Sequence, residues 1–213
     1  MPPVIILFAK APVPGRVKTR LAESLGEEAA AELHEAFAAD MLAKLDGLAG
    51  VSIELHTDIE TDAWRDRRVA RKLQSGGDLG ERMLHALSGA LDAGRPAAMI
   101  VGSDSPDLPA LYLEELLTLP ADVALGPSED GGYYAIGCRH THSRMFAGVP
   151  WSTSMTLAET ERSASACGLS VARGSSWYDV DDLVTLLRLR QSSGIPPRTA
   201  AWFARHAGLL RDY

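Results

Sequence analysis

The chain has 213 residues, of which 46% are hydrophobic, and this length and composition fit one α/β domain with a substantial core. Its net charge of −7 and pI near 5.4 argue against nucleic acid as a bulk partner. The first apolar run is short and soon meets Lys10, so we expect neither a signal peptide nor a membrane span. The two distant cysteines, Cys138 and Cys167, fit free thiols in a reducing cytosol, so we expect a cytoplasmic protein.

Strand and helix patterns alternate along the whole chain. We expect strands at 4–7, 51–56, 97–102, 122–127, 133–138 and 169–173, and a strand or helical turn at 69–73. We expect helices at 22–48 with an early break at Gly26, and at 78–93, 110–117, 155–167 and 183–191. The patterns at 58–68 and 141–146 leave loop and helix open, and 195–213 reads as a C-terminal helical tail. This alternation predicts a single three-layer α/β domain with a mostly parallel sheet over residues 1–213.

The loop after the first strand is the most informative stretch. Residues 8–21 contain two prolines, Gly15 and the four cations Lys10, Arg16, Lys18 and Arg20, and a helix follows. Glycine lets the backbone approach a ligand, a helix start offers free N–H groups, and cations neutralise charge, so this loop predicts a polyphosphate site. A plain strand–helix connection with surface cations is the alternative, whereas the P-loop pattern is absent.

Isolated carboxylates follow two other expected strands. Asp104 follows the strand at 97–102, and Asp179 and Asp181 follow the strand at 169–173. Ligands of open α/β sheets bind beyond the carboxyl ends of strands, so these carboxylates and the basic loop could meet at one edge. Mg²⁺ prefers one or two carboxylates with phosphate oxygens and water, which makes Asp104 and Asp181 candidate ligands, with Asp179 in support. Turn formation by Asp104 and helix capping by the late aspartates are the alternatives.

A polar turn and a tryptophan are further candidates for the site. Residues 129–132, Glu-Asp-Gly-Gly, separate two apolar strands and are typical of a hairpin, but they could also present N–H groups and a carboxylate to a ligand. Trp151 could stack on a base or sugar, although core packing is the alternative. His140 and His142 lack a third ligand and fit a surface loop, and no hydrolase motif is present.

Taken together, these motifs resemble the nucleotide-diphospho-sugar transferase superfamily. The signature residues are Lys10, Pro12, Gly15 and the run at 18–21, followed by segments 77–83, 102–109, 126–134 and 179–181. The sequence is similar to the rSAM/selenodomain-associated glycosyltransferases and, more distantly, to phospholactate and molybdenum-cofactor guanylyltransferases. The likeness covers roughly residues 4 to 190 and implies a Rossmann-like GT-A fold with a mixed, mostly parallel sheet.

The resemblance also implies roles for matched residues. In relatives the basic loop holds a triphosphate, the segment matching 74–80 lies near the base, and the positions matching Asp104 and Asp181 bind the metal. This chain departs from the common L-A-A-G-x-G-x-R start, because prolines replace the glycine-rich turn, and it has no D-x-D at Asp104. We expect nucleotide contacts from Ala9, Lys10, Gly15, Lys18, Gln74, Gly77, Asp78, Gly80, Arg82 and Ser103. We expect catalysis to involve Lys18, Arg20 and Asp104, and acceptor binding to involve Glu129, Asp130, Gly131, Gly132 and Trp151.

These observations predict a transferase that requires Mg²⁺ or Mn²⁺ and takes an NTP or a nucleotide sugar together with a small-molecule acceptor. Nucleotidyl transfer from an NTP to a phosphorylated small molecule, with release of pyrophosphate, is the leading hypothesis. Glycosyl transfer from a nucleotide-diphospho-sugar is the second, and a nucleotide-binding protein without turnover is the third. The base, the acceptor and the oligomeric state stay open.

Overall fold

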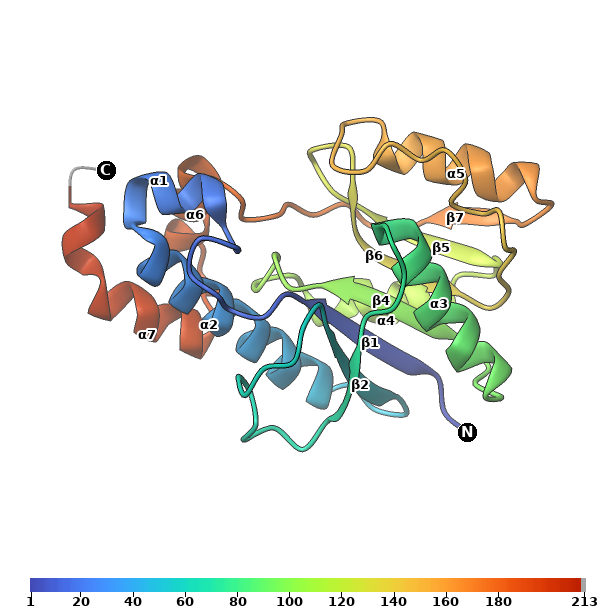
Figure 1. Ribbon diagram of the computed structural model, residues 1–213, viewed down its shortest axis with the longest axis horizontal. Helices are drawn as coiled ribbons and strands as arrows, with labels where there is room; N and C mark the ends of the chain where they lie inside the picture. Colours follow the sequence, from blue (N-terminus) through green and yellow to red (C-terminus); the bar gives the residue numbers. More distant parts are fainter. Residues whose placement is uncertain (212–213) are drawn as a thin grey trace.

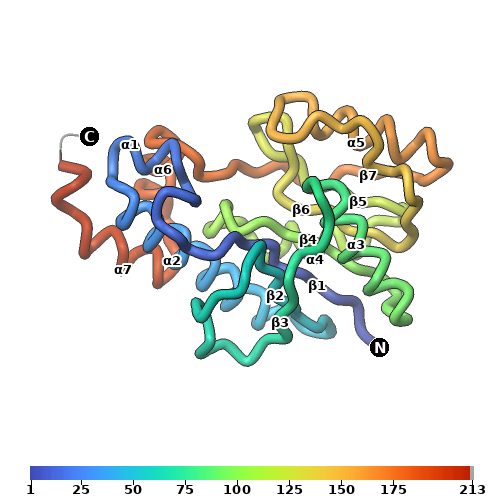
Figure 2. Tube along the Cα trace, in the orientation of Figure 1, coloured from blue at the N-terminus to red at the C-terminus, as the bar shows by residue number. Residues whose placement is uncertain are grey.

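The computed structural model describes residues 1–211 and contains one seven-stranded sheet in the order β3-β2-β1-β4-β6-β5-β7 (Figures 1 and 2). Its strands are β1 (Val4–Ala9), β2 (Ser52–Thr57), β3 (Ala70–Leu73), β4 (Ala98–Gly102), β5 (Val123–Pro127), β6 (Tyr133–Cys138) and β7 (Val171–Arg173). Only β6 runs antiparallel to its neighbours β4 and β5, and the other pairs in the sheet are parallel. The expected mostly parallel mixed sheet is confirmed.

The helices complete the chain as expected, with small shifts at their ends. They are α1 (Thr19–Leu25), α2 (Glu27–Asp46), α3 (Leu79–Asp92), α4 (Ala110–Thr118), α5 (Thr156–Ala166), α6 (Leu183–Gln191) and α7 (Pro197–Arg205), followed by a 3-10 turn, η1 (Ala207–Leu210). The first helix begins at Thr19, earlier than the expected residue 22, and Gly26 (φ 84°) separates it from α2. Of the open stretch 69–73, residues 70–73 form the strand β3, whereas 58–68 and 141–146 consist of turns and irregular loop.

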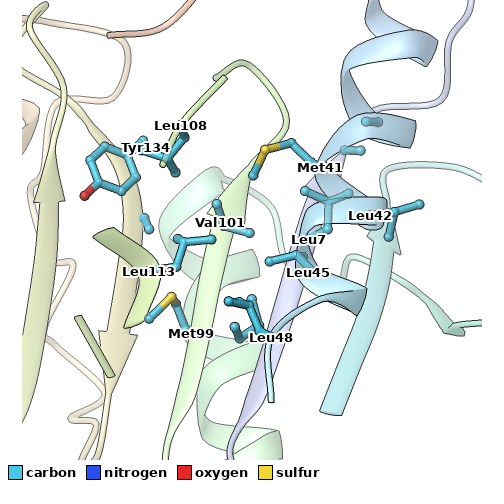
Figure 3. Close-up of a cluster of buried hydrophobic side chains, with 14 of the residues drawn as sticks. Leu7, Met41, Leu42, Leu45, Leu48, Met99, Val101, Leu108, Leu113 and Tyr134 are labelled. Carbon is cyan, nitrogen blue, oxygen red and sulfur yellow. The ribbon is translucent and has the colours of Figure 1, made fainter. Parts of the chain in front are cut away.

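Alternating side chains of the strands build a core on each face of the sheet. Ile5 and Leu7 of β1 join α2 and α4 on one face, and Val4 and Ile6 join α3 and α5 on the other. Figure 3 shows the first of these cores, where the C-terminal half of α2 packs on β1 and β4. Burial on both faces explains why β1 and β4 read as continuous apolar runs and not as alternating ones.

A second group of helices lies beyond the carboxyl ends of the strands. α1, the first half of α2, α6 and α7 share a separate core around Phe37 and Trp202, which we call the helical lobe (Figure 1). Trp202 is fully buried and donates a hydrogen bond from its indole nitrogen to the Ala29 carbonyl at 3.0 Å. The buried Asp40 carboxylate accepts the backbone N–H groups of Arg198 and Thr199 at the start of α7. The tail therefore packs on α2, and its last two residues, 212 and 213, lie outside the described part.

No helix within residues 1–211 combines the length and the apolar character needed to cross a membrane.

Candidate functional site

Four loops gather at the carboxyl edge of the sheet, facing the helical lobe. They are residues 10–18 after β1, 103–109 after β4, 128–132 between β5 and β6, and 174–182 after β7. Segment 174–182 crosses from the sheet to the lobe and ties the loops together (Figure 1). The Val180 N–H donates to the Asp104 carbonyl at 2.9 Å, and the Trp177 carbonyl accepts from the Glu129 N–H at 3.0 Å. The predicted elements of the site therefore share one edge.

Lys18 joins the two candidate metal ligands. Its ammonium lies 2.5 Å from Asp104 Oδ1 and 3.0 Å from Asp181 Oδ1, and it donates to the Val180 carbonyl at 2.7 Å. The Lys18 side chain is only 3% exposed, whereas those of Asp104 and Asp181 are 42% and 45% exposed. Asp104 and Asp181 are thus paired with a buried ammonium on one side and exposed to solvent on the other.

Backbone conformation and charge both hold Lys18 in this place. The residue has left-handed backbone angles (φ 47°, ψ 43°) where the loop turns into α1. Burial by itself would lower the pKa of Lys18, but Asp104 and Asp181 outweigh that effect and raise it. Burial would likewise raise the pKa of Asp104, yet the Lys18 charge brings it below its ordinary value. Lys18 and Asp104 are therefore both ionised at neutral pH.

Asp179 lies behind this cluster and connects two loops. Its Oδ1 accepts from the Ser105 hydroxyl at 2.5 Å and its Oδ2 lies 2.6 Å from the Ser128 hydroxyl. Burial, against the opposing effect of these serines, raises the pKa of Asp179 to about 6, and the charges of Asp104 and Asp181 add to the rise. Asp179 thus supports the position of the acidic segment from the β4 and β5 loops.

The donor set at Asp104 and Asp181 suits a divalent cation that is shared with substrate. Within residues 1–211, no three His, Cys, Asp or Glu side chains converge as a complete metal site. Two carboxylates do converge, and the Oδ2 atom of each makes no hydrogen bond to any described residue. Mg²⁺ commonly takes one or two carboxylates and completes its shell with phosphate oxygens and water, so the residues fit.

The other cations of the basic loop differ in their partners. Arg16 pairs with Asp58 at 3.5 Å, and Arg20 is exposed on α1. The Lys10 side chain is exposed, while its carbonyl accepts a hydrogen bond from His34 Nε2 at 2.9 Å. Gly15 has a positive φ of 75°, which explains the glycine in this turn. Ala9 and Ser103, the last predicted nucleotide contacts at this edge, are both buried.

The predicted base-binding segment lies at the start of α3. Asp78 caps this helix as expected by accepting from the Glu81 N–H at 2.8 Å, and the Glu81 side chain accepts from the Gly77 N–H at 2.7 Å. Gln74 donates to the His56 carbonyl of β2 at 3.1 Å. Arg82 donates to the Gly76 carbonyl, so protein contacts already use several groups that were predicted to contact nucleotide.

Trp151 and the 128–132 turn border this segment. The indole of Trp151 packs so closely on Gly80 that an added Cβ there would lie 2.7 Å from it. Gly131 approaches Ser154 in the same way, with φ 90°. The Ser128 N–H donates to the Gly132 carbonyl at 3.0 Å, which closes the expected hairpin, and within the turn the Asp130 carboxylate accepts from the Gly132 N–H at 2.9 Å. The predicted base-binding and acceptor-binding segments are therefore adjacent. Much of the Trp151 ring packs against protein, however, on Gly80 and Phe146.

Glu129 reaches a partner that the sequence did not suggest. Both of its carboxylate oxygens accept from Arg188 of α6, at 2.6 and 3.0 Å, and the Arg188 guanidinium stacks 3.8 Å from the Tyr178 ring centre. This bidentate pair links the β5–β6 turn to the helical lobe. Glu129 would have to leave Arg188 in order to contact an acceptor.

Ser105, Ser128, Arg188 and His34 are the functional candidates that sequence reasoning missed. The two serines stand beside predicted site residues, but only their contact with Asp179 reveals a role. Arg188 lies on α6 and His34 on α2, where nothing in the sequence pattern distinguishes them from their neighbours. His34 Nδ1 is buried without a hydrogen-bond partner among the described residues, and burial lowers the pKa of this imidazole.

The fold and the layout of this edge resemble those of nucleotidyltransferases and nucleotide-sugar transferases. The chain belongs to the family described as "Uncharacterized protein conserved in bacteria (DUF2064)", which matches residues 39–153. A crystal structure of a candidate nucleotide-diphospho-sugar transferase from Desulfovibrio desulfuricans G20 is 32% identical, with a TM-score of 0.87 over 99% of this chain and 97% of that one.

More remote solved structures share the fold alone. A nucleotidyl transferase from Methanothermobacter is 13% identical, with a TM-score of 0.55 over 100% of this chain and 99% of that one. A CMP-2-keto-3-deoxy-manno-octonic acid synthetase in complex with CTP is 12% identical, with a TM-score of 0.54 over 89% of this chain and 97% of that one. No curated protein matches the sequence.

Proposed function

We propose that this protein is a divalent-metal-dependent nucleotidyltransferase that moves a nucleotidyl group from an NTP to a phosphorylated small molecule. The observation that carries the proposal is the convergence of Asp104, Asp181 and Lys18 at the end of β1 and β4. Two half-exposed carboxylates beside a cationic loop suit a triphosphate with its metal.

In this reaction a phosphate oxygen of the acceptor forms a bond to the α-phosphorus of the NTP. The bond from that phosphorus to the bridging oxygen of the β-phosphate breaks, and pyrophosphate leaves with the electron pair. Asp104 and Asp181 would hold the divalent cation, which neutralises phosphate charge when bound. The exposed Lys10 and Arg20 side chains would bind phosphate oxygens, and the loop around Gln74 and Gly77 would lie near the base.

A thermal-shift panel tests the proposal. All NTPs and common nucleotide sugars are added with Mg²⁺ or with EDTA, because a ligand that binds only the folded state raises the melting temperature. We expect one NTP to stabilise the protein only with Mg²⁺, and Asp104→Asn to lose that stabilisation. Asp92→Asn is the matched control, since Asp92 is an exposed carboxylate at the far end of α3. Equal stabilisation of Asp104→Asn and the parent protein would contradict the assigned site.

Glycosyl transfer from a nucleotide-diphospho-sugar is the second candidate function. It is favoured by the name given to the 32% identical Desulfovibrio protein and by the resemblance to rSAM/selenodomain-associated glycosyltransferases. This reaction releases a nucleoside diphosphate, whereas nucleotidyl transfer releases pyrophosphate, so analysis of the products separates the two. Metal-independent stabilisation without product would favour a nucleotide-binding protein that has lost turnover.

A further inference from the structure

The Lys18 ammonium is enclosed by oxygen atoms, two of which accept hydrogen bonds from it and one of which forms an ion pair with it. An ammonium has three N–H groups, and three oxygens surround this one: Asp104 Oδ1, Asp181 Oδ1 and the Val180 carbonyl. With 3% of its side chain exposed, Lys18 cannot reach an incoming phosphate without leaving these carboxylates. The residue predicted to bind triphosphate is therefore engaged with the residues predicted to bind metal.

The charges explain why the ammonium and a divalent cation compete. Without Lys18, the two carboxylates would face each other with no positive charge between them. With a divalent cation on Asp104 and Asp181, a Lys18 ammonium in contact with the same carboxylates would be repelled by the metal at short range. Each cation thus makes the other unfavourable, while either one relieves the repulsion between the carboxylates.

We propose that Lys18 is a placeholder for the catalytic divalent cation: it neutralises Asp104 and Asp181 in the metal-free protein and leaves them when the metal binds. This inference rests on the metal site of the proposed function. Its flexible four-carbon side chain permits the movement, and the released ammonium becomes available to phosphate oxygens at the same edge. Metal and phosphate binding then favour each other, because phosphate stabilises the displaced lysine.

The first test measures Mn²⁺ affinity without nucleotide, from the signal of free Mn²⁺ in electron paramagnetic resonance. Lys18→Met keeps the length of the side chain and removes its charge, so we expect it to bind Mn²⁺ about tenfold more tightly than the parent protein. Arg16→Met is the matched control. It removes a positive charge from the same loop, but Arg16 pairs with Asp58 and not with Asp104 or Asp181. Its affinity should lie within about twofold of the parent.

Two results of this titration would overturn the placeholder. One is an unchanged or weaker Mn²⁺ affinity in Lys18→Met, as expected if the lysine only positions the carboxylates. The other is an equal gain in Arg16→Met, which would reflect the general charge of the loop and not the Lys18 contact.

A second measurement uses the unaltered protein, in case Lys18→Met fails to fold. Acetylation of lysines by an N-hydroxysuccinimide ester is followed by peptide mass spectrometry as Mg²⁺ is added. We expect Lys18 to be protected without metal and to react faster as Mg²⁺ saturates the site. Lys44 is the internal control for effects of Mg²⁺ on the reagent, because it donates to the Pro106 and Leu108 carbonyls and its rate should not change with Mg²⁺. A Lys18 that reacts no faster at any Mg²⁺ concentration than it does in EDTA would refute displacement.

The outcomes also separate this inference from the proposed function. Release of Lys18 by Mg²⁺ with no NTP bound or turned over would leave the placeholder standing and remove nucleotidyl transfer. Pyrophosphate formation with Lys18 still protected in Mg²⁺ would support nucleotidyl transfer and refute the placeholder role of Lys18.

Discussion

The half-buried carboxyl of Asp179 should make the stability of this protein depend on pH, and Asp179→Asn should remove that dependence. Asp179 lies within hydrogen-bond distance of Ser105 and Ser128, and Ser128 also lies 2.6 Å from Asp130. One hydroxyl proton cannot serve both carboxylates. An asparagine amide can donate to Ser128 and accept from Ser105, which leaves the Ser128 proton for Asp130.

The sign follows from the proton count. Burial raises the pKa of Asp179 from 3.8 to about 6, so between these pH values the folded state holds a proton that the unfolded state has lost. The free energy of unfolding of the parent protein therefore falls as pH rises through this window and levels off above it. A pKa change from 3.8 to about 6 corresponds to about 3 kcal/mol at most, and Asp179→Asn does not incur this loss.

Urea unfolding of both proteins between pH 4 and 7.5, with EDTA present, measures the difference. We expect Asp179→Asn to gain on the parent steadily from pH 4 and to be about 1–3 kcal/mol more stable at pH 7.5. The depressed pKa of Asp122, about 2, lies below the window and is common to both proteins. Parallel stability curves, or a parent protein that is the more stable one at pH 7.5, would refute the reasoning.

Three further predictions concern the frame of the site. Gly80→Ala places a Cβ against Trp151 and should cost about 1–3 kcal/mol in urea unfolding, while Gly89→Ala, in the last turn of the same helix where an added Cβ meets open space, should gain about 0.5–1 kcal/mol. Asp40→Ala leaves the donors at the start of α7 unpaired and should cost about 3 kcal/mol, seen in the circular-dichroism melt; a cost under about 0.5 kcal/mol would mean that the tail hardly needs this cap. Burial lowers the pKa of Lys44 to about 8, so from pH 8 to 10.5 the unfolded state binds more protons and the parent protein should gain stability relative to Lys44→Met; a constant difference would contradict it.

The features of the fold that sequence could predict are those that local chemistry decides. The apolar sequence of β1 predicts burial because both faces of this strand are covered. Asp78 caps α3 by accepting a hydrogen bond from the Glu81 N–H, three residues further along the chain. The reversed direction of β6 is less visible, since an apolar strand looks the same in either direction and only the hairpin at 128–132 indicates it. The start of α1 moves to Thr19 because Lys18 adopts a left-handed conformation that helix propensity does not describe.

In the candidate site, too, some features follow from the sequence pattern and others depend on contacts between distant residues. Topology places Asp104 and Asp181 at one edge, and the sequence indicated that edge from the order of strands and loops. The partners of Lys18 depend instead on a contact 163 residues away along the chain, and on a helical lobe whose docking no periodicity reveals. Because segment 174–182 is fixed by Asp179 on one side and by the lobe on the other, it brings Asp181 to Lys18 before any ligand binds. The basic loop therefore supplies the counter-charge of this acidic pair through Lys18, the residue that the sequence had assigned to phosphate.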